Sequence, residues 1–512
     1  MCESPVYASR LALFTIISLC SFVFSLYYWQ SFYEYSHEII KPDDNGLRAS
    51  VQNGPHTNQP NILLIITDDQ GYNDIGYNSF YGIQTPVIDK LANEGLILDN
   101  YYVQPICTPT RGQLYSGVHE IHTGLYTVIR PGHRVGLPLN FPTIAGKLKE
   151  AGYSTHLVGK WHLGYYTKRH LPTRRGFDSF FGLLNGHSNH FNYTVAQSYD
   201  LHEGENNADM AKYKGRYSTH LFAEKAINII NNHHGKNPLF LVVSFTAPHE
   251  PLQVPEKYKL MYENLLINTT PEKQTYAGMI SCVDEAVGNI TEAFKRKGFW
   301  NNTVMIYTSD NGATGRMPNS NYPLRGHKGN VFEGGIKVPS FVHSNLMKTN
   351  VKGTISKELL HVTDWFPTLA GLGQANINDI KQLYGYDMRD TIFEGKKSPR
   401  TEIVHVINPE RVQEGEPAYN NTFDSRIKSA LRQGDWKLLT NPSEKHEDTL
   451  FLFNIKDDPR EKHDLSQVHP HIVKKMLDRL EHHRRTAVPP LNYVRDERCR
   501  PALHNNFWVP WL

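Results

Sequence analysis

The chain has 512 residues, which is enough for one large domain or for a large domain and a smaller one. A hydrophobic fraction of 39% and a charged fraction of 21% are those of an ordinary globular protein. The formal net charge of +3 is too small to indicate a nucleic-acid or membrane-surface partner. Composition therefore argues against a nucleic-acid-binding protein, but it names no function.

The N-terminus carries a targeting signal. Arg10 precedes an apolar run without charges at residues 11–29. This pattern predicts a secretory signal, and the run approaches the length of a membrane-spanning helix. No small-residue cleavage site follows, so both a removed signal peptide and an uncleaved signal anchor at residues 11–29 remain open. In either case we expect a secretory-pathway protein that is lysosomal, secreted or anchored with its bulk outside the cytosol.

Glycosylation sequons and cysteine usage refine this picture. The sequons support the secretory route and begin at Asn192, Asn268, Asn289, Asn301 and Asn420. Beyond the signal region only Cys107, Cys282 and Cys499 remain. Exported proteins usually use cysteines in bridges, and three cysteines allow at most one bridge. At least one thiol is therefore left for another task.

From residue 61 onward, short apolar runs alternate with longer amphipathic stretches. We predict buried strands at 62–66, 155–158, 239–245 and 304–307, and helices at 142–151, 218–231 and 276–297. Continuous apolar runs are typical of parallel strands that are buried on both faces. The alternation predicts an α/β sandwich around a large, mostly parallel sheet.

The pattern changes beyond about residue 410. We predict antiparallel strands within 429–440 and at 450–455, followed by a helix at 469–484. The predicted division is a signal and linker at 1–57, a larger domain at 58–410 and a smaller α+β domain at 411–512.

Polar side chains follow each of the predicted buried strands. In order along the chain they are Asp68 and Asp69, Lys160 and His162, His249, and Asp310 and Asn311. Singly, each has an ordinary reading: the paired aspartates could cap a helix, and a lone histidine is more often structural. Because ligands bind at the carboxyl ends of strands in open α/β sheets, we expect them to form a single site.

The donor types at this predicted site indicate a metal. Asp68, Asp69, Asp310 and Asn311 offer three carboxylates and an amide, and the sequence has no Cys/His pair at zinc spacing. Hard oxygen ligands favour calcium or magnesium over zinc, and a carboxylate-rich set favours calcium over magnesium.

The segment from Cys107 through Pro109 and Arg111 to Gly117 resembles the sulfatase signature C-x-P-x-R, which is followed by a small residue and glycine. The resemblance extends from about residue 60 to 465 and is closest to the branch of arylsulfatases B, I and J. It implies an alkaline-phosphatase-like α/β/α fold and the hydrolysis of sulfate esters. Thr110 stands where serine is common, and the bridges expected of arylsulfatase B are mostly missing, so the exact substrate stays open.

The resemblance also implies residue roles. By this resemblance, Cys107 would be oxidised to formylglycine by the formylglycine-generating enzyme and would bind calcium together with Asp68, Asp69, Asp310 and Asn311. Arg111 and Lys160 would stabilise the hydrated aldehyde and the metal-bound oxygens, and His162 would take a proton. His249 and Lys328 would protonate the leaving alcohol, and together with Lys160 they would bind the substrate. Independently, Pro109 suits the first turn of a helix that begins near residue 107, where backbone N–H groups favour an anion.

Two other functions would share parts of this pattern. A phosphate or phosphonate monoester hydrolase would keep the fold, but the sequence lacks a second set of His/Asp ligands for a two-metal centre. An inactive homologue that only binds sulfated glycans would be expected to have lost Cys107, Arg111 or the acids, and all are present. The resemblance implies an aryl or sugar sulfate as substrate, with N-acetylgalactosamine 4-sulfate as one alternative, and loops 187–207 and 315–322 are expected to shape specificity.

Overall fold

The computed structural model describes residues 59–263, 269–316, 318–442 and 450–512. The predicted signal at 11–29 and the sequon at Asn268 lie outside these ranges. Within them, no helix combines the length and hydrophobicity that crossing a membrane requires.

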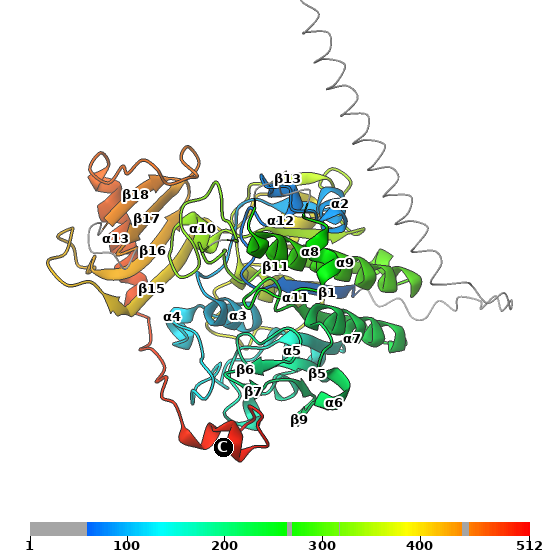
Figure 1. The fold of residues 1–512 in the computed structure, drawn as a ribbon. Coiled ribbons are helices and arrows are strands. Elements are labelled where there is room, and N and C mark those ends of the chain that lie inside the picture. The colour runs from blue at the N-terminus through cyan, green and yellow to red at the C-terminus, as the bar shows by residue number, and fades with distance from the viewer. Residues whose placement is uncertain (1–58, 264–268, 317, 443–449) are drawn as a thin grey trace, which may run out of the picture. The chain divides into compact units, whose positions relative to one another are not determined.

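A mostly parallel sheet forms the centre of the larger part of the described chain (Figure 1). Its core strands are β11 (Thr303–Ser309), β1 (Asn61–Thr67), β10 (Leu239–Ser244), β4 (Ser154–Lys160) and β5 (Ser179–Leu183), and neighbours in this series are parallel. The outer strands are β2 (Leu96–Leu98), β12 (Ser340–Ser344), β13 (Thr354–Ser356), β8 (His202–Glu203) and β9 (Asn206–Asn207). The full order is β13-β2-β12-β11-β1-β10-β4-β5-β8-β9.

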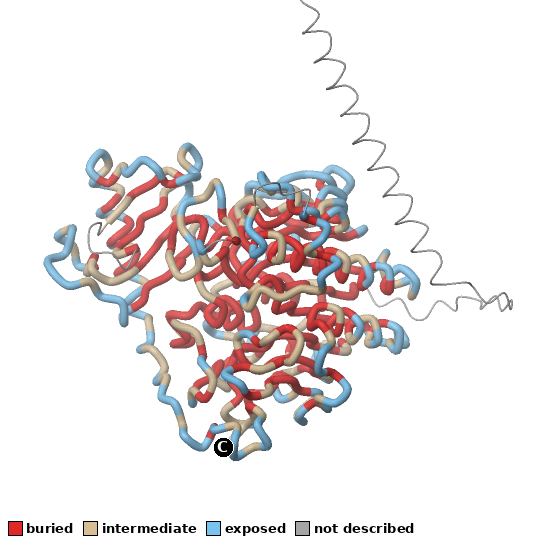
Figure 2. Tube along the Cα trace, in the orientation of Figure 1, coloured by how far each residue is buried: buried red, intermediate tan, exposed pale blue. Residues whose placement is uncertain are grey.

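Helices cover both faces of this sheet. On one face lie α2 (Pro86–Glu94), α7 (Ser218–Asn232) and α9 (Pro271–Arg296), and on the other lie α3 (Cys107–Ser116), α5 (Ile144–Glu150) and α11 (Trp365–Leu372). Strand β1 explains the layering, because Leu63 and Ile65 pack towards the first group while Ile62, Leu64 and Ile66 pack towards the second. The apolar side chains between the sheet and the helices are buried on both faces (Figure 2). The predicted α/β/α sandwich is confirmed.

Helix boundaries follow local capping. Helix α9 begins at Pro271 rather than at the predicted residue 276, because Thr270 accepts a hydrogen bond from the N–H of Lys273 and a proline suits the first helical position. Helix α5 begins after Thr143, whose hydroxyl accepts from the N–H of Gly146. The shorter helices are α4 (Glu120–Thr123), α6 (Met210–Tyr213), α8 (Glu256–Leu260), α10 (Glu333–Ile336) and α12 (Arg389–Glu394).

A four-stranded antiparallel sheet with one long helix forms the smaller part. It contains β15 (Glu402–Val412), β16 (Ile427–Gln433), β17 (Trp436–Thr440), β18 (Leu450–Asn454) and α13 (Pro470–Arg484). The predicted strand region 429–440 contains two strands, because Gly434 (φ 56°) makes a tight turn between them. The predicted domain boundary at residue 410 falls inside β15.

The residues after α13 return to the larger part. The indole of Trp508 donates to the carbonyl of Val195 at 3.0 Å, and the N–H of Arg134 donates to the carbonyl of Val494 at 2.9 Å. Residues 488–512 therefore pack on the larger part, although the predicted division grouped them with the smaller one. Two short strand pairs complete the fold: β3 (Tyr101–Tyr102) with β14 (Leu360–His361), and β6 (Thr194–Val195) with β7 (Ser198–Tyr199).

Candidate active site

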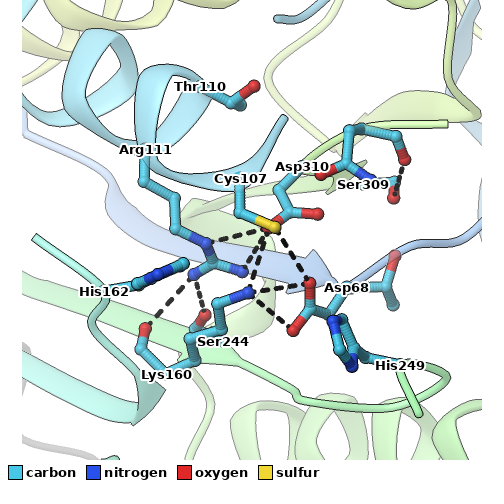
Figure 3. A network of polar contacts seen from close by, with 12 residues as sticks. Asp68, Cys107, Thr110, Arg111, Lys160, His162, Ser244, His249, Ser309 and Asp310 are labelled. Atoms are coloured by element: carbon cyan, nitrogen blue, oxygen red, sulfur yellow. Dashed lines mark hydrogen bonds and ion pairs between the residues drawn. The ribbon is translucent and has the colours of Figure 1, made fainter. Parts of the chain in front are cut away.

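The carboxyl ends of four adjacent strands meet at one edge of the large sheet. Strand β1 runs into Asp68 and Asp69, β11 into Asp310 and Asn311, β4 ends at Lys160 and leads to His162, and β10 leads to His249. Helix α3 adds Cys107 and Arg111, and Figure 3 shows their side chains pointing towards those of Asp68, Lys160 and Asp310. The structure thus brings together the predicted site residues from segments far apart in sequence.

The acidic residues form a compact cluster. One ligand atom from each of Asp68, Asp69, Cys107 and Asp310 lies within 4.8 Å of the others, and all four side chains are buried. The amide of Asn311 donates to Asp69 Oδ1 at 2.7 Å, and its own Oδ1 is buried without a hydrogen-bond partner. Such an oxygen beside three carboxylates fits a hard divalent cation.

Helix α3 places Cys107 at its first position, as Pro109 in the first turn led us to expect. The Cys107 Sγ atom lies 3.8 Å from Asp68 Oδ1. Burial, together with the nearby charge of Asp310, raises the pKa of the thiol to about 12. An unmodified thiol here is therefore protonated at neutral pH and is a poor nucleophile. Cys282 and Cys499 are also free and do not pair.

Arg111 links the elements that surround the cluster. Its Nε and Nη2 atoms each lie 2.9 Å from Asp310 Oδ2, and its Nη1 donates to the Ser244 hydroxyl at 2.7 Å and to the Lys160 carbonyl at 3.2 Å. Burial alone would raise the pKa of Asp310, but the charges of Arg111 and the nearby lysines lower it. Asp310 is thus a carboxylate under all ordinary conditions.

Two lysines and a histidine face the other two acids. Lys160 Nζ contacts both oxygens of Asp68, while Lys328 Nζ lies 2.5 Å from Asp69 Oδ1 and His249 Nε2 lies 3.5 Å from Asp69 Oδ2. Burial favours protonation of Asp69, but the charges of His249 and Lys328 outweigh it and lower its pKa. The site therefore concentrates positive groups where an anionic ligand would bind.

His162 has one ring nitrogen available for chemistry. Its Nε2 lies 2.9 Å from the carbonyl of Ile129, whereas its Nδ1 is buried without a hydrogen-bond partner. Burial and the positive charges of Lys160 and Arg111 hold its pKa well below the usual value. The neutral ring donates through Nε2–H to Ile129, so Nδ1 carries the free lone pair and can accept a proton.

Two residues that support the site were missed by sequence reasoning. Ser244 ends β10 and accepts from Arg111, and its only sequence signal is a polar residue that closes an apolar strand. His190 Nε2 lies 3.0 Å from the carbonyl of His249 and so fixes that loop. No sequence signal distinguishes His190 from the other histidines.

A parallel sheet between two helical layers, with buried acids and cations at its carboxyl edge, defines an enzyme of the alkaline-phosphatase-like fold. The sequence matches the Sulfatase family over residues 60–375. It is also 43% identical over 509 residues to arylsulfatase J of Mus musculus, covering 92% of this chain and 84% of that protein. The chain therefore belongs to the sulfatase family, and it is a sulfuric ester hydrolase.

Two further similarities agree with this family and fold. N-acetylgalactosamine-6-sulfatase of Mus musculus is 26% identical over 490 residues, which cover 88% of this chain and 90% of that protein. The crystal structure of Ps i-CgsB in complex with k-i-k-neocarrahexaose superposes with a TM-score of 0.75 at 28% identity, covering 86% of this chain and 95% of that one. The family resemblance and fold predicted from sequence are confirmed.

Proposed function

We propose that this sulfatase cleaves sulfate monoesters with a formylglycine made from Cys107 and a bound calcium ion. The observation that carries the proposal is the position of Cys107, which begins α3 and shares a buried cluster with Asp68, Asp69 and Asp310. A thiol with a raised pKa would be a weak nucleophile there, whereas an oxygen on the same carbon would suit a hard cation.

The proposed metal ligands are the three carboxylates of the cluster, the unpartnered Oδ1 of Asn311 and the modified side chain at position 107. All of these donors would be oxygens, which favours calcium, with magnesium as the less suitable alternative. When bound, such a cation supplies positive charge that offsets the negative oxygens of the sulfate group.

The remaining groups have distinct proposed tasks. Arg111 and Lys160 orient and stabilise the oxygens of residue 107, because both reach the cluster from fixed, buried positions. His162 accepts a proton at Nδ1, its free nitrogen. His249 and Lys328 hold the sulfate beside Asp69 and give a proton to the leaving alcohol.

The proposed substrates are aryl sulfates or sugar sulfates, with the N-acetylgalactosamine 4-sulfate type as one member of the second class. Two relatives support the sugar class: one is named for N-acetylgalactosamine 6-sulfate, and the crystal structure of the other contains a neocarrahexaose. The formylglycine-generating enzyme is the proposed maturation partner.

We further propose a secretory-pathway location, lysosomal, extracellular or anchored through residues 11–29. The sequon residues Asn289, Asn301 and Asn420 are exposed, as glycan attachment requires, and Asn192 is half-buried. We also propose the sequence-based division into a signal and linker, a catalytic domain and a smaller C-terminal domain, with residues 488–512 assigned to the catalytic part by their contacts.

The test is expression with and without the formylglycine-generating enzyme, followed by peptide mass analysis at position 107 and assays on sulfate, phosphate and phosphonate monoesters. We expect aldehyde at position 107 and sulfatase activity only after co-expression. Cys107→Ala should be inactive, while the matched variant Cys282→Ala, which alters a buried thiol outside the site, should remain active. Sulfatase activity in Cys107→Ala, or a preference for phosphate esters, would refute the proposal.

A further inference from the structure

A short segment after β5 lies across two histidines of the active site. A Cβ atom on Gly186 would stand only 2.6 Å from Cε1 of His162, so the backbone there packs directly against that ring. The next residue, His187, stacks on His249 with ring centroids 5.2 Å apart and an interplanar angle of 13°. Residues 186 and 187 thus contact both the proton acceptor His162 and the substrate-binding His249.

Buried hydrogen bonds hold the segment that contains residues 186 and 187 in place. The N–H groups of Leu184 and Asn185 donate to the two carboxylate oxygens of Asp200 at 3.1 and 2.9 Å. On the other side, His190 ties the segment to the carbonyl of His249. The position of His187 is therefore set by the fold before any ligand binds, which limits the entropy lost when a ligand binds to it.

The nitrogens of His187 are free, unlike those of its neighbours. His190 uses both ring nitrogens, one on Ser218 and one on His249, and His162 uses one on Ile129. Among the described residues, neither ring nitrogen of His187 has a hydrogen-bond partner, and the residue is exposed to solvent.

The charge state of His187 is also defined. Desolvation of the ring by the surrounding protein atoms, together with the positive charges of His249, Lys160 and Lys328, lowers its pKa to about 4. The ring is therefore neutral at neutral and mildly acidic pH. A neutral imidazole presents one hydrogen-bond donor and one acceptor, a combination that matches a hydroxyl group.

We infer that His187 is a substrate-binding residue that hydrogen-bonds a hydroxyl group on the alcohol half of the substrate, next to the sulfate ester. The inference rests on the proposed function, in which His249 and Lys328 hold the sulfate. A ring stacked on the face of His249 lies beside that sulfate, where the leaving alcohol is. Among the proposed substrates, it selects sulfates of hydroxyl-bearing sugars over simple aryl sulfates.

The test compares His187→Phe with the wild-type enzyme, both carrying formylglycine. Phenylalanine keeps the stacked ring and removes both nitrogens, so folding should be preserved. The substrates are 4-nitrophenyl sulfate, which has no hydroxyl, and N-acetylgalactosamine 4-sulfate and galactose 4-sulfate, which have a hydroxyl next to the ester. We expect kcat/KM on the better sugar sulfate to fall about tenfold or more, mainly through KM, and that on 4-nitrophenyl sulfate to change less than about threefold.

A matched control is His234→Phe, an exposed histidine that precedes β10 at the opposite edge of the sheet, which should alter neither rate. Equal losses on both substrate classes, no loss on either, or a wild-type enzyme that cleaves the aryl sulfate but neither sugar sulfate would overturn the role of His187. Failure of the wild-type enzyme on every sulfate ester would instead contradict the proposed function itself, so the two failures are distinguishable.

Discussion

Lys160 donates to both carboxylate oxygens of Asp68, at 2.8 and 2.7 Å, and neither side chain is exposed to solvent. The same ammonium lies 3.5 Å from Asp310. Removing one partner of a buried ion pair leaves an uncompensated charge, which typically costs about 3–5 kcal/mol. Lys160 is therefore expected to matter for stability as well as for catalysis.

We predict that Lys160→Met lowers kcat/KM by about 10²–10³, the usual loss when one transition-state contact is removed. In the presence of a chelator, the variant should also have a lower Tm than the wild-type protein, because Asp68 then has no cationic partner. Added calcium should restore part of that Tm by pairing with Asp68. Lys149→Met, which breaks an exposed pair with Asp178, is the control. An unchanged Tm in chelator would contradict the structural half of this prediction.

Calcium should stabilise the folded protein through the acidic cluster. A ligand at about 100 times its Kd adds about 2.7 kcal/mol to the free energy of unfolding, so calcium should raise the Tm of the wild-type protein measurably. Asp69→Asn removes one proposed ligand and should abolish most of this rise. The exposed Asp387→Asn should not change it. Equal calcium-induced shifts in the wild-type protein and Asp69→Asn would show that the cation binds elsewhere.

A second buried charge cluster joins the smaller sheet to the larger part. Lys437 Nζ lies 2.8 Å from a carboxylate oxygen of Glu333 and 2.8 Å from one of Glu461, and all three side chains are fully buried. Glu333 begins α10, and its side chain pairs there with Lys437 of β17 in the smaller sheet.

We predict that Lys437→Met lowers the free energy of unfolding by about 3–5 kcal/mol, because two carboxyl groups then lose their shared partner. The kcat/KM of the folded variant should stay near the wild-type value, since Lys437 does not contact the active site. Adding Glu333→Gln and Glu461→Gln removes the unpaired charges and should recover part of the loss. Urea unfolding of the three proteins measures this, and a triple variant less stable than Lys437→Met would count against the explanation.

The sequence predicts the meeting of Asp68, Lys160, His249 and Asp310 because each follows a buried strand, and parallel neighbours present their carboxyl ends at one edge. This convergence is expected for any order of parallel strands in the sheet. The position of Cys107 is also predictable, since Pro109 identifies the first turn of its helix. Local patterns of this kind depend on only a few neighbouring residues.

Other features depend on packing between distant segments, which local patterns do not contain. Nothing near His187 indicates that its ring stacks on His249, which lies 62 positions away in the chain. Likewise, the sequence grouped the C-terminal residues with the smaller domain, whereas in the structure Trp508 donates to the carbonyl of Val195 in the larger part. The free nitrogen of His162 follows from the position of the Ile129 carbonyl, which only the folded chain specifies.

The stability of the protein should increase as the pH falls from 8 to 5, and Asp284 in α9 should contribute to this. Its carboxylate accepts hydrogen bonds from the N–H groups of Ile88 and Val87 at 2.7 and 3.2 Å, at the start of α2. Burial raises its pKa to about 7, above the value of about 3.9 for an unfolded chain. Between those values the folded state binds a proton that the unfolded state does not, so stability falls as pH rises through this window.

Asp284→Asn keeps a hydrogen-bond acceptor for the start of α2 but cannot ionise. The difference in unfolding free energy between pH 5 and pH 8 should therefore shrink by about 2–3 kcal/mol relative to the wild-type protein. Some dependence should remain, because burial also raises the pKa values of Asp74 and Glu461 to about 7. Urea unfolding midpoints at the two pH values measure the effect, with Asp387→Asn as the exposed control. If Asp284→Asn and the wild-type protein respond equally to pH, Asp284 is already ionised in the folded state at pH 5, and its hydrogen bonds from α2 outweigh its burial.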